Sequence, residues 1–184
     1  MTDEEIKRIL QGRLSEKRFR HSLAVADMAR ELAGLHGGDE DKAYLAGLVH
    51  DCMRELPRED ALAYFHDHNI SLTPLEENSP NLWHAILGYH AIPTLFGIED
   101  PDIRNAVRYH TTARAGMSLL ERIVYVADCT SADRRYDDVE DVRRMARNCL
   151  NDGVKASIEF CIADLGRKGI PVHPDTLAAA KEYV

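Results

Sequence analysis

The chain has 184 residues, of which 45% are hydrophobic, and this size and composition are typical of one domain with a single core. Its formal net charge of −8 excludes nucleic acid and anionic membranes as general partners, because both repel an acidic surface. A small nucleotide in a cleft with its own cations stays possible. No stretch is apolar for long enough to cross a bilayer, and Met1–Glu5 is acidic where a secretory signal is basic and then apolar. We therefore expect one domain over residues 1–184, located in the cytoplasm.

The four cysteines form no CxxC pair and no dense framework. In a reducing compartment free thiols behave as small core residues. A cysteine–zinc site is therefore not expected.

The apolar residues repeat at helical spacing, and no run alternates apolar and polar residues as a half-buried strand does. A first helix, from about Glu16 to Leu35, has one face with apolar positions at i+4, i+7 and i+11 counted from His21, so His21 points inward. Gly37 ends this helix, and Asp39 caps a second one that leads to the pair His50-Asp51. The spacing predicts an all-α fold.

Pro57 opens a third helix that runs through Phe65, and residues 68–80 are rich in Asn, Thr, Ser and Pro, which predicts a loop. The next helix follows Pro80 and carries His84. Pro93 is expected to kink or end that helix, because proline lacks the backbone N–H.

Asp100 and the proline after it predict the start of another helix, whose apolar face closes at His110. Ser118 and Glu121 fit a capping box, and the helix that they start carries Asp128 on its apolar stripe. Helices near residues 139–150 and 153–165, a turn at 169–174 and a short terminal helix complete the chain.

The adjacent pair His50-Asp51 is the most informative feature, because imidazole and carboxylate are costly to bury unpaired and a metal ion satisfies both. The helical spacing turns His21, His110 and Asp128 inward, and His84 begins another apolar segment. A lone inward histidine is more often a hydrogen-bonded core residue than a ligand. Several such residues on separate helices instead favour a metal site of the form H…HD…H…H…D.

Imidazole and carboxylate without thiolate suit iron, manganese, cobalt or zinc rather than calcium. A metal in such a site lowers the pKa of bound water toward ~7 and polarises phosphoryl oxygens, which favours metal-assisted hydrolysis. The alternative is a metal that only holds structure. Structural zinc sites usually contain cysteine and have ligands close in sequence, whereas these residues spread from His21 to Asp128.

Five segments resemble the HD-domain metallophosphohydrolases, and more closely the bacterial YqeK family within them. They read RHSLAVADMARELA around His21, AGLVHDCMRELP around His50-Asp51, LWHAILGYH around His84, IRNAVRYHTTARAGMSLLERIVYVAD up to Asp128, and RKGIPVHPDT near the end. The HD dipeptide alone is frequent by chance. The YHTT-x-R-x-GMSLLE and PVHPDT segments are specific, and the resemblance covers almost the whole chain.

The resemblance implies an HD-type helical bundle that hydrolyses diadenosine tetraphosphate at its centre and releases two ADP. The expected metal is iron, with manganese or cobalt as alternatives. Carried over by position, the primary ligands are His21, His50, Asp51 and Asp128. His84 and His110 then lie near the phosphates or hold a second metal. Arg54 stands where the family usually has lysine, so a planar fork replaces a point charge.

The resemblance also assigns roles. The catalytic residues are Asp51, Arg54, His84 and His110. Among them, Arg54 stabilises developing charge, and His84 or His110 protonates the leaving ADP. Arg134 and the segment from Ile170 to Asp175 hold the adenosine half. The full set of expected substrate contacts is His21, His50, Arg54, His84, His110, Thr111, Asp128, Arg134, Ile170, Pro171, Val172, His173, Pro174 and Asp175.

Several of these residues have a structural alternative. Arg54, Arg114 and Arg134 can be solvated cations, which is the usual fate of arginine. Thr111 can cap a helix end or make a turn, and His173 can serve only as a cap.

Two other functions are compatible with the same sequence. An HD-type nucleotidase or cyclic-dinucleotide phosphodiesterase keeps the fold and the metal but changes the substrate. A non-catalytic module keeps the ligands and uses them only to bind a nucleotide or a metal. We also expect a homodimer as the one protein partner of this chain.

Overall fold

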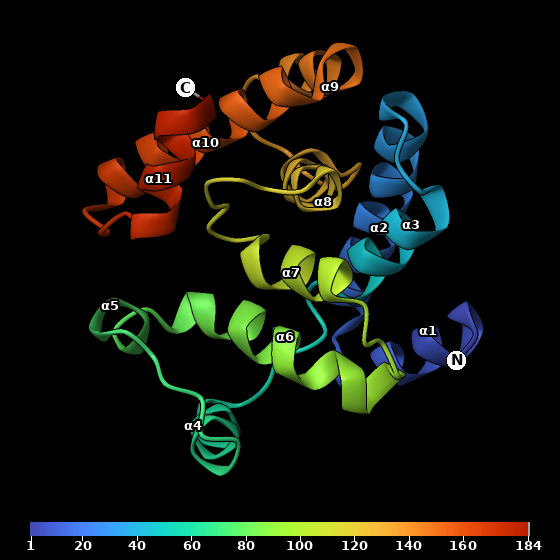
Figure 1. Cartoon of the computed structure of the whole chain (residues 1–184), viewed down its shortest axis with the longest axis vertical. Helices are drawn as coiled ribbons and strands as arrows, with labels where there is room; N and C mark the ends of the chain where they lie inside the picture. Colours follow the sequence, from blue (N-terminus) through green and yellow to red (C-terminus); the bar gives the residue numbers. More distant parts are fainter. Residues whose placement is uncertain (184) are drawn as a thin grey trace.

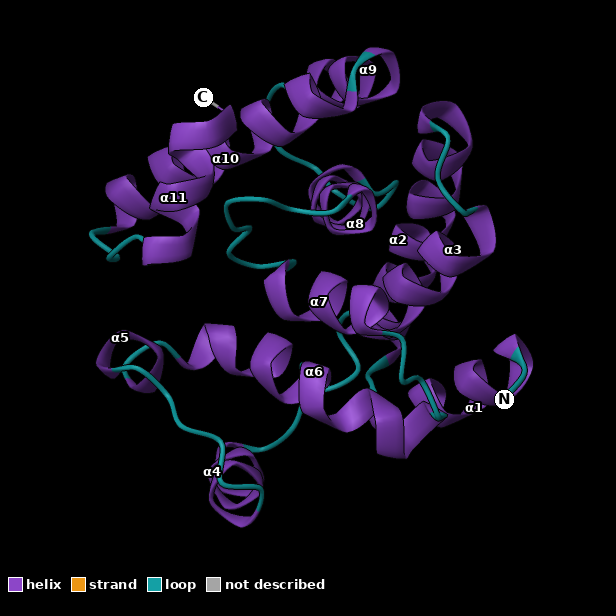
Figure 2. Ribbon diagram, in the orientation of Figure 1, coloured by secondary structure: helices purple, strands orange, loops and turns teal. Residues whose placement is uncertain are grey.

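The computed structural model describes residues 1–183, and all regular structure among them is helical, with no strand (Figure 2). The prediction of an all-α fold is confirmed. The elements are α1 (Asp3–Arg13), α2 (Glu16–His36), α3 (Glu40–Val49), α4 (Arg58–Asp67), α5 (Pro74–Glu77), the 3-10 turn η1 (Pro80–Leu82), α6 (Trp83–Phe96), α7 (Pro101–Tyr109), α8 (Leu119–Thr130), α9 (Val139–Asn148), α10 (Leu150–Lys168) and α11 (Pro174–Tyr183).

Helix α8 lies at the centre of the molecule, where Figure 1 shows it end-on. It packs against α2 and α3 on one side, α7 on another and α10 on a third. Because α8 is enclosed on several sides, most of its residues from Leu120 to Ala127 are buried, including Tyr125. Helix α7 packs against α3, α6 and α8.

The predicted helix ends are confirmed where the capping residue acts locally. The Asp39 side chain accepts a hydrogen bond from the backbone N–H of Lys42 at 2.9 Å. Ser118 and Glu121 form the capping box at the start of α8. Gly37 ends α2 with a φ of 72°, a left-handed conformation that glycine adopts without steric cost.

Two helices fall where the sequence patterns predicted none. Helix α1 begins at a capping box formed by Thr2 and Glu5 and buries Ile6 and Leu10. Helix α5 interrupts the predicted 68–80 loop and has a capping box of its own. Both carry the T-x-x-E signature. Helix α5 has too few apolar positions for a periodic pattern, but Ile6, Ile9 and Leu10 of α1 follow helical spacing, so the sequence did contain a signal for α1.

Pro93 does not end α6, which continues to Phe96. Proline removes the hydrogen bond to the carbonyl four residues earlier, here that of Tyr89. Arg104 from α7 donates its Nε–H to that carbonyl at 3.1 Å. The interior proline is tolerated because a neighbouring helix satisfies the group that it leaves free.

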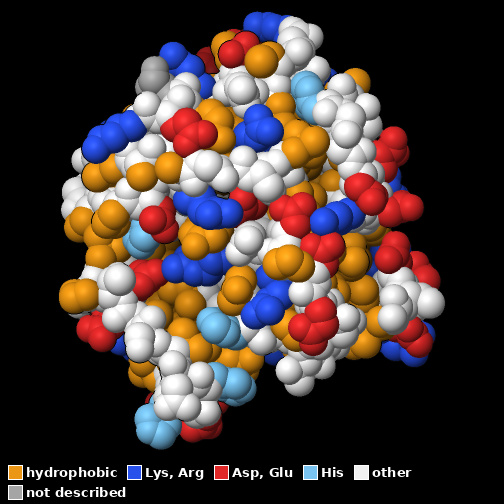
Figure 3. All heavy atoms as spheres, viewed as in Figure 1, with side chains coloured by type: hydrophobic (Ala, Val, Ile, Leu, Met, Phe, Trp, Pro, Cys, Tyr) orange, Lys and Arg blue, Asp and Glu red, His pale blue; other side chains and the backbone are white. Residues whose placement is uncertain are grey.

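No helix within residues 1–183 has the length and apolar character needed to cross a membrane. Figure 3 shows basic side chains gathered over the middle of one face, among carboxylates. Two arginines of the chain are paired with buried glutamates: Arg108 with Glu76 at 2.6 Å, and Arg114 with Glu121 at 2.8 Å. For Arg114 this contact is a structural ion pair with a residue of the α8 capping box.

Helices α2 and α3 approach each other closely at Gly47, where an added Cβ would lie 2.9 Å from Cα of Ala26 and 3.0 Å from the carbonyl oxygen of Val25. Gly47→Ala is therefore expected to destabilise the fold by about 1–3 kcal/mol, because backbone atoms cannot move aside as a side chain can. Gly12→Ala, in α1, meets nothing within 4 Å and serves as the control, with a neutral or slightly stabilising effect. Thermal unfolding of both variants tests this, and equal midpoints would contradict the close crossing.

Candidate metal and phosphate site

His50 and His110 occupy the same local position, each directly after the last residue of a helix. The Nδ1–H of His50 donates to the carbonyl of Gly47 at 2.6 Å, and that of His110 donates to the carbonyl of Val107 at 2.7 Å. Because Nδ1 carries the proton in this arrangement, the lone pair of the neutral ring lies on Nε2. A hydrogen bond from the outer nitrogen to a backbone carbonyl is also how metal-ligating histidines are usually oriented.

The Nε2 atom of His50 is buried and has no hydrogen-bond partner among the described residues. Burial lowers the pKa of His50 to about 4, so the ring is neutral at pH 7. A buried acceptor without a partner is costly, and a cation removes that cost by taking the lone pair. The donors present here therefore fit a divalent metal.

His21 on α2 faces Asp128 on α8, with 3.0 Å between Nε2 and Oδ1. Its other ring nitrogen lies 2.8 Å from a carboxylate oxygen of Asp133, in the segment after α8. Burial by itself lowers the pKa of His21, but the carboxylates of Asp128 and Asp133 outweigh burial and raise it. The pKa of Asp128 is lowered despite burial, because His21 and Arg134 favour the charged form.

Asp51 lies between the histidines and links the two sides of the site. Its Oδ1 is 3.1 Å from Nε2 of His84 and 3.6 Å from Nε2 of His110, and its Oδ2 is 2.8 Å from Nη1 of Arg18. Burial would raise the pKa of Asp51, but the surrounding imidazoles outweigh burial and hold the pKa well below its usual range. Asp51 is therefore a carboxylate with a donor at each oxygen, Arg18 at Oδ2 and His84 at Oδ1.

The structure brings together all six residues of the H…HD…H…H…D pattern. Their nitrogen and carboxylate oxygen atoms form three overlapping groups, each with all atoms within 4.8 Å of one another: His21, His50 and Asp51; His50, His110 and Asp128; Asp51, His84 and His110. None of the groups among the described residues includes a cysteine.

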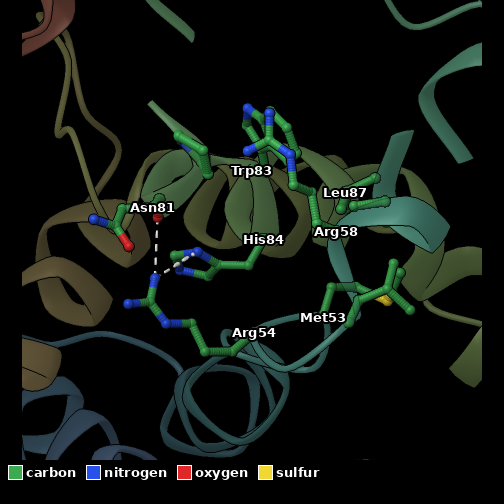
Figure 4. Close-up of a pocket in the computed structure, with 10 residues that line it drawn as sticks. Met53, Arg54, Arg58, Asn81, Trp83, His84 and Leu87 are labelled. Carbon is green, nitrogen blue, oxygen red and sulfur yellow. Dashed lines mark hydrogen bonds between the residues drawn. The ribbon is translucent and has the colours of Figure 1, made fainter. Parts of the chain in front are cut away.

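His84, in the first turn of α6, is held in the opposite tautomer. Arg54 donates one Nη1 to Nδ1 of His84 at 2.8 Å and to the carbonyl of Asn81 at 3.0 Å (Figure 4). Since a guanidinium can only donate, Nδ1 of His84 accepts, and the proton of the neutral ring lies on Nε2. Burial lowers the pKa of His84 to about 4. His84 therefore presents an N–H to the cluster, whereas His50 presents a lone pair.

The sequence patterns missed three contacts of the site. Arg18 lies three residues before His21 on the same face of α2, so the helical period did contain a signal for it. Asp133 and Asn81 lie in short segments outside the α-helices, where no period indicates which way a side chain points. They could not have been found from spacing.

Thr111 lies next to His110, and its buried Oγ1 has no hydrogen-bond partner among the described residues. It lines a largely apolar cavity of about 650 Å³ together with Ile170, Pro171 and His173. Val172, Pro174 and Asp175 do not line that cavity. His173 also accepts the backbone N–H of Asp175 at 3.1 Å, so it caps α11 as well as lining the cavity.

Arg134 does not line the cavity beside Thr111. It donates Nε–H to the backbone carbonyl of Asp128 at 2.7 Å and pairs with the carboxylate of the same residue. It lines a separate cavity of about 490 Å³ that Arg18 and His21 also line. The structure therefore places Arg134 and the 170–175 segment on different cavities around one cluster.

A sequence profile described as HD domain matches residues 18–133, which include the whole cluster. The chain belongs to the HD-domain family. The resemblance seen in the sequence motifs is thereby confirmed.

Relatives of nearly the same length support this assignment. The chain is 36% identical over 176 residues to a protein of Bacillus subtilis named bis(5'-nucleosyl)-tetraphosphatase, symmetrical, with 96% of this chain and 94% of the relative covered. A protein of Staphylococcus aureus with the same name is 32% identical over 185 residues, with 100% and 95% covered.

A solved structure has the same HD-domain fold. It is described as a predicted HD superfamily hydrolase involved in NAD metabolism from Clostridium acetobutylicum. The TM-score is 0.94 at 35% identity, and the match covers 98% of this chain and 96% of that one. The fold is thus shared from end to end.

The buried histidines make the metal-free HD domain sensitive to acid. His50 and His84 have a pKa of about 4 when folded and an ordinary value of 6.5 when unfolded, so between these values the unfolded chain binds protons that the folded chain does not. Stability therefore falls as pH falls through this window, by roughly 2 kcal/mol per pH unit between pH 6 and 5. The pKa of His21 is raised, so the folded chain holds this proton more tightly than the unfolded chain; His21 opposes the slope near pH 6.5 and adds little near pH 5, where it is protonated in both states.

Urea unfolding of chelator-treated protein at several pH values measures this slope. His84→Gln is expected to reduce it by about half. The control His66→Gln, whose side chain is 90% exposed, leaves it unchanged. An unfolding midpoint that does not move between pH 6 and 5 would contradict the burial of neutral imidazoles.

Proposed function

We propose that this chain is a metal-dependent hydrolase that cleaves diadenosine tetraphosphate symmetrically into two ADP. The observation that carries the proposal is the convergence of four histidines and two aspartates in one core. Among them, the buried Nε2 of His50 has no hydrogen-bond partner among the described residues. The near-full-length relatives named as symmetrical tetraphosphatases indicate the substrate. Two more distant relatives carry the name Ap4A hydrolase as part of a longer name.

We propose that His21, His50, Asp51 and Asp128 hold one divalent cation. Nitrogen and oxygen donors without thiolate suit iron, with manganese or cobalt as substitutes. Cys52 does not compete for the metal, because burial raises the pKa of its thiol to about 12. When bound, such a metal acts as a Lewis acid toward phosphoryl oxygens and activates water at neutral pH.

Asp51, His84 and His110 offer a second cation position. Binding through Nε2 of His84 would require its proton to move to Nδ1, and Arg54 would then lose the acceptor that it now contacts. We infer that one cation is bound and that His84 keeps its Nε2–H. It then donates this hydrogen bond to a phosphate oxygen and does not transfer the proton itself.

The cations around the cluster are suited to a polyphosphate. Arg54 has no carboxylate within ion-pair distance among residues 1–183, so its charge is available to a substrate. Arg18 and Arg134 stand on the other side, where each already contacts an aspartate of the cluster. Positioning and charge neutralisation contribute most of the catalysis in phosphoryl transfer, and these three arginines supply both.

We assign the adenosine of one half to the cavity beside Thr111. The cavity is lined mainly by apolar groups, which suits a base, and Thr111, whose Oγ1 has no hydrogen-bond partner among the described residues, is next to His110 in the chain. Ile170, Pro171 and His173 also line it.

The substrate is a small nucleotide and not a nucleic acid, because a net charge of −8 repels a long polyanion. The four cysteines are free thiols, which is typical of a cytoplasmic protein. The homodimer stays a prediction.

Product identity and one substitution test the proposal together. Metal-loaded protein is expected to convert diadenosine tetraphosphate to ADP alone, and AMP with ATP would contradict symmetrical cleavage. Asp51→Ala removes the carboxylate shared by two ligand groups and should lower kcat by about 1,000-fold or more, with helicity retained. Asp27→Ala, an exposed position on α2, is the control.

Metal analysis should give one equivalent of metal per chain. Two equivalents would instead assign His84 and His110 to a second ion.

Arg54 offers a separate test of phosphate binding. Arg54→Ala should lower kcat/KM by about 10- to 100-fold, because a charge-assisted hydrogen bond to the phosphates is lost. Arg54→Lys keeps the charge and should stay within about tenfold of the native rate. Steady-state kinetics with diadenosine tetraphosphate measure both variants, and a native rate for Arg54→Ala would exclude Arg54 from the reaction.

A further inference from the structure

A third, smaller pocket opens on the opposite side of His84 from the metal ligands. It has a volume of about 250 Å³, and its walls include Arg54, Arg58, Asn81, Trp83 and His84. Figure 4 shows Arg54 reaching toward Asn81 and His84, while Arg58 lies over Trp83 across the opening. The pocket is thus bordered by two guanidinium groups from two sides.

These two arginines differ from most other cations of this acidic chain. Neither Arg54 nor Arg58 has a carboxylate within ion-pair distance in the described part of the chain, although acidic residues outnumber basic ones by 31 to 23. The guanidinium of Arg58 instead lies 4.9 Å from the ring centroid of Trp83. Stacking holds the orientation of Arg58 but leaves its donors free. Two unneutralised like charges around one small pocket favour an anion between them.

The pocket is also in the right place relative to the cleavage centre. His84 is its inner wall: Nδ1 of His84 contacts Arg54, and Nε2 on the far side of the same ring is 3.1 Å from Asp51. A group in the pocket is therefore separated from the metal ligands by one imidazole ring.

We propose that this pocket, called here the Arg58 pocket, binds the diphosphate of the second nucleotide half, the half that departs when the central phosphoanhydride is cleaved. The proposal rests on the proposed function. A symmetrical substrate has two identical halves, and the cavity beside Thr111 accommodates only one of them. The other half must leave the centre in another direction, and the Arg58 pocket provides an opening with its own cations.

The size of the pocket indicates which part of that half it holds. At about 250 Å³ it is smaller than typical sites for a whole drug-sized ligand, so it suits the diphosphate alone. A neighbouring cavity of about 550 Å³ shares Arg58 and Trp83 with it and is lined by apolar residues such as Phe65 and Ile70 together with Ser71 and Glu77. The nucleoside of the departing half extends into that cavity.

Arg58→Gln tests the pocket without disturbing the metal ligands. KM for diadenosine tetraphosphate should rise about tenfold or more, with kcat within about twofold of native, because the lost contact exists in both ground and transition state. Arg58→Lys should restore most of the affinity. Arg58 is exposed and is the first residue of α4, where a cation opposes the helix dipole, so its removal should not weaken the fold.

The control is Arg30→Gln, which also removes an arginine stacked on an aromatic ring, 3.9 Å from the centroid of Tyr44, but away from the pocket. It should leave KM unchanged. An equal rise in KM for Arg30→Gln and Arg58→Gln would overturn the proposal, since it would reflect only the loss of positive charge. An unchanged KM for Arg58→Gln would overturn it directly.

A binding measurement separates this inference from the proposed function. Calorimetric titration of the metal-loaded protein with ADP should give two bound ADP per chain for the native protein and one for Arg58→Gln. One ADP for the native protein, or two for Arg58→Gln, would reject the pocket while symmetrical hydrolysis still stands. Absence of any tetraphosphate cleavage would reject the proposed function, and the titration would still decide whether the pocket binds a nucleoside diphosphate.

Discussion

The site depends on one recurring interaction, the hydrogen bond from a histidine Nδ1 to the backbone carbonyl three residues earlier. His50 and His110 both make it, to Gly47 and Val107. The bond fixes ring orientation and tautomer together, so the lone pair of each neutral ring lies on Nε2; that of His50 has no partner among the described residues, and that of His110 lies 3.1 Å from Nε2 of His84. Because the acceptors belong to the last turns of α3 and α7, the geometry of the cluster follows from where these helices end.

Such a cluster is costly to build without a cation. Imidazoles and carboxylates are buried side by side, and burial alone disfavours the charged forms of His50, Asp51 and Asp128. The fold compensates by surrounding the site with well-packed helices, of which α8 is the most enclosed. Arg18 and Arg134 supply positive charge at two of the aspartates. The result is a preformed site in which a bound metal would add stability.

Net charge and local charge differ in this protein. The chain is acidic overall, yet arginines gather around the cluster, and Arg54 and Arg58 remain unneutralised beside it. Coulomb interactions across a narrow cleft are strong and weakly screened, whereas distant surface carboxylates are screened by solvent and salt. An acidic protein can therefore bind a polyphosphate while it repels longer polyanions.

The sequence by itself determined the helical class, most helix ends and the six residues of the cluster, since capping and the 3.6-residue period act within a few residues of each other. It did not determine the tautomer of His84, the contact of Asp133 with His21, or the placement of Arg134 and the 170–175 segment on separate cavities. Those features arise where irregular segments and separate helices meet. Only tertiary packing decides them, because periodicity carries no information about how one helix is oriented against another.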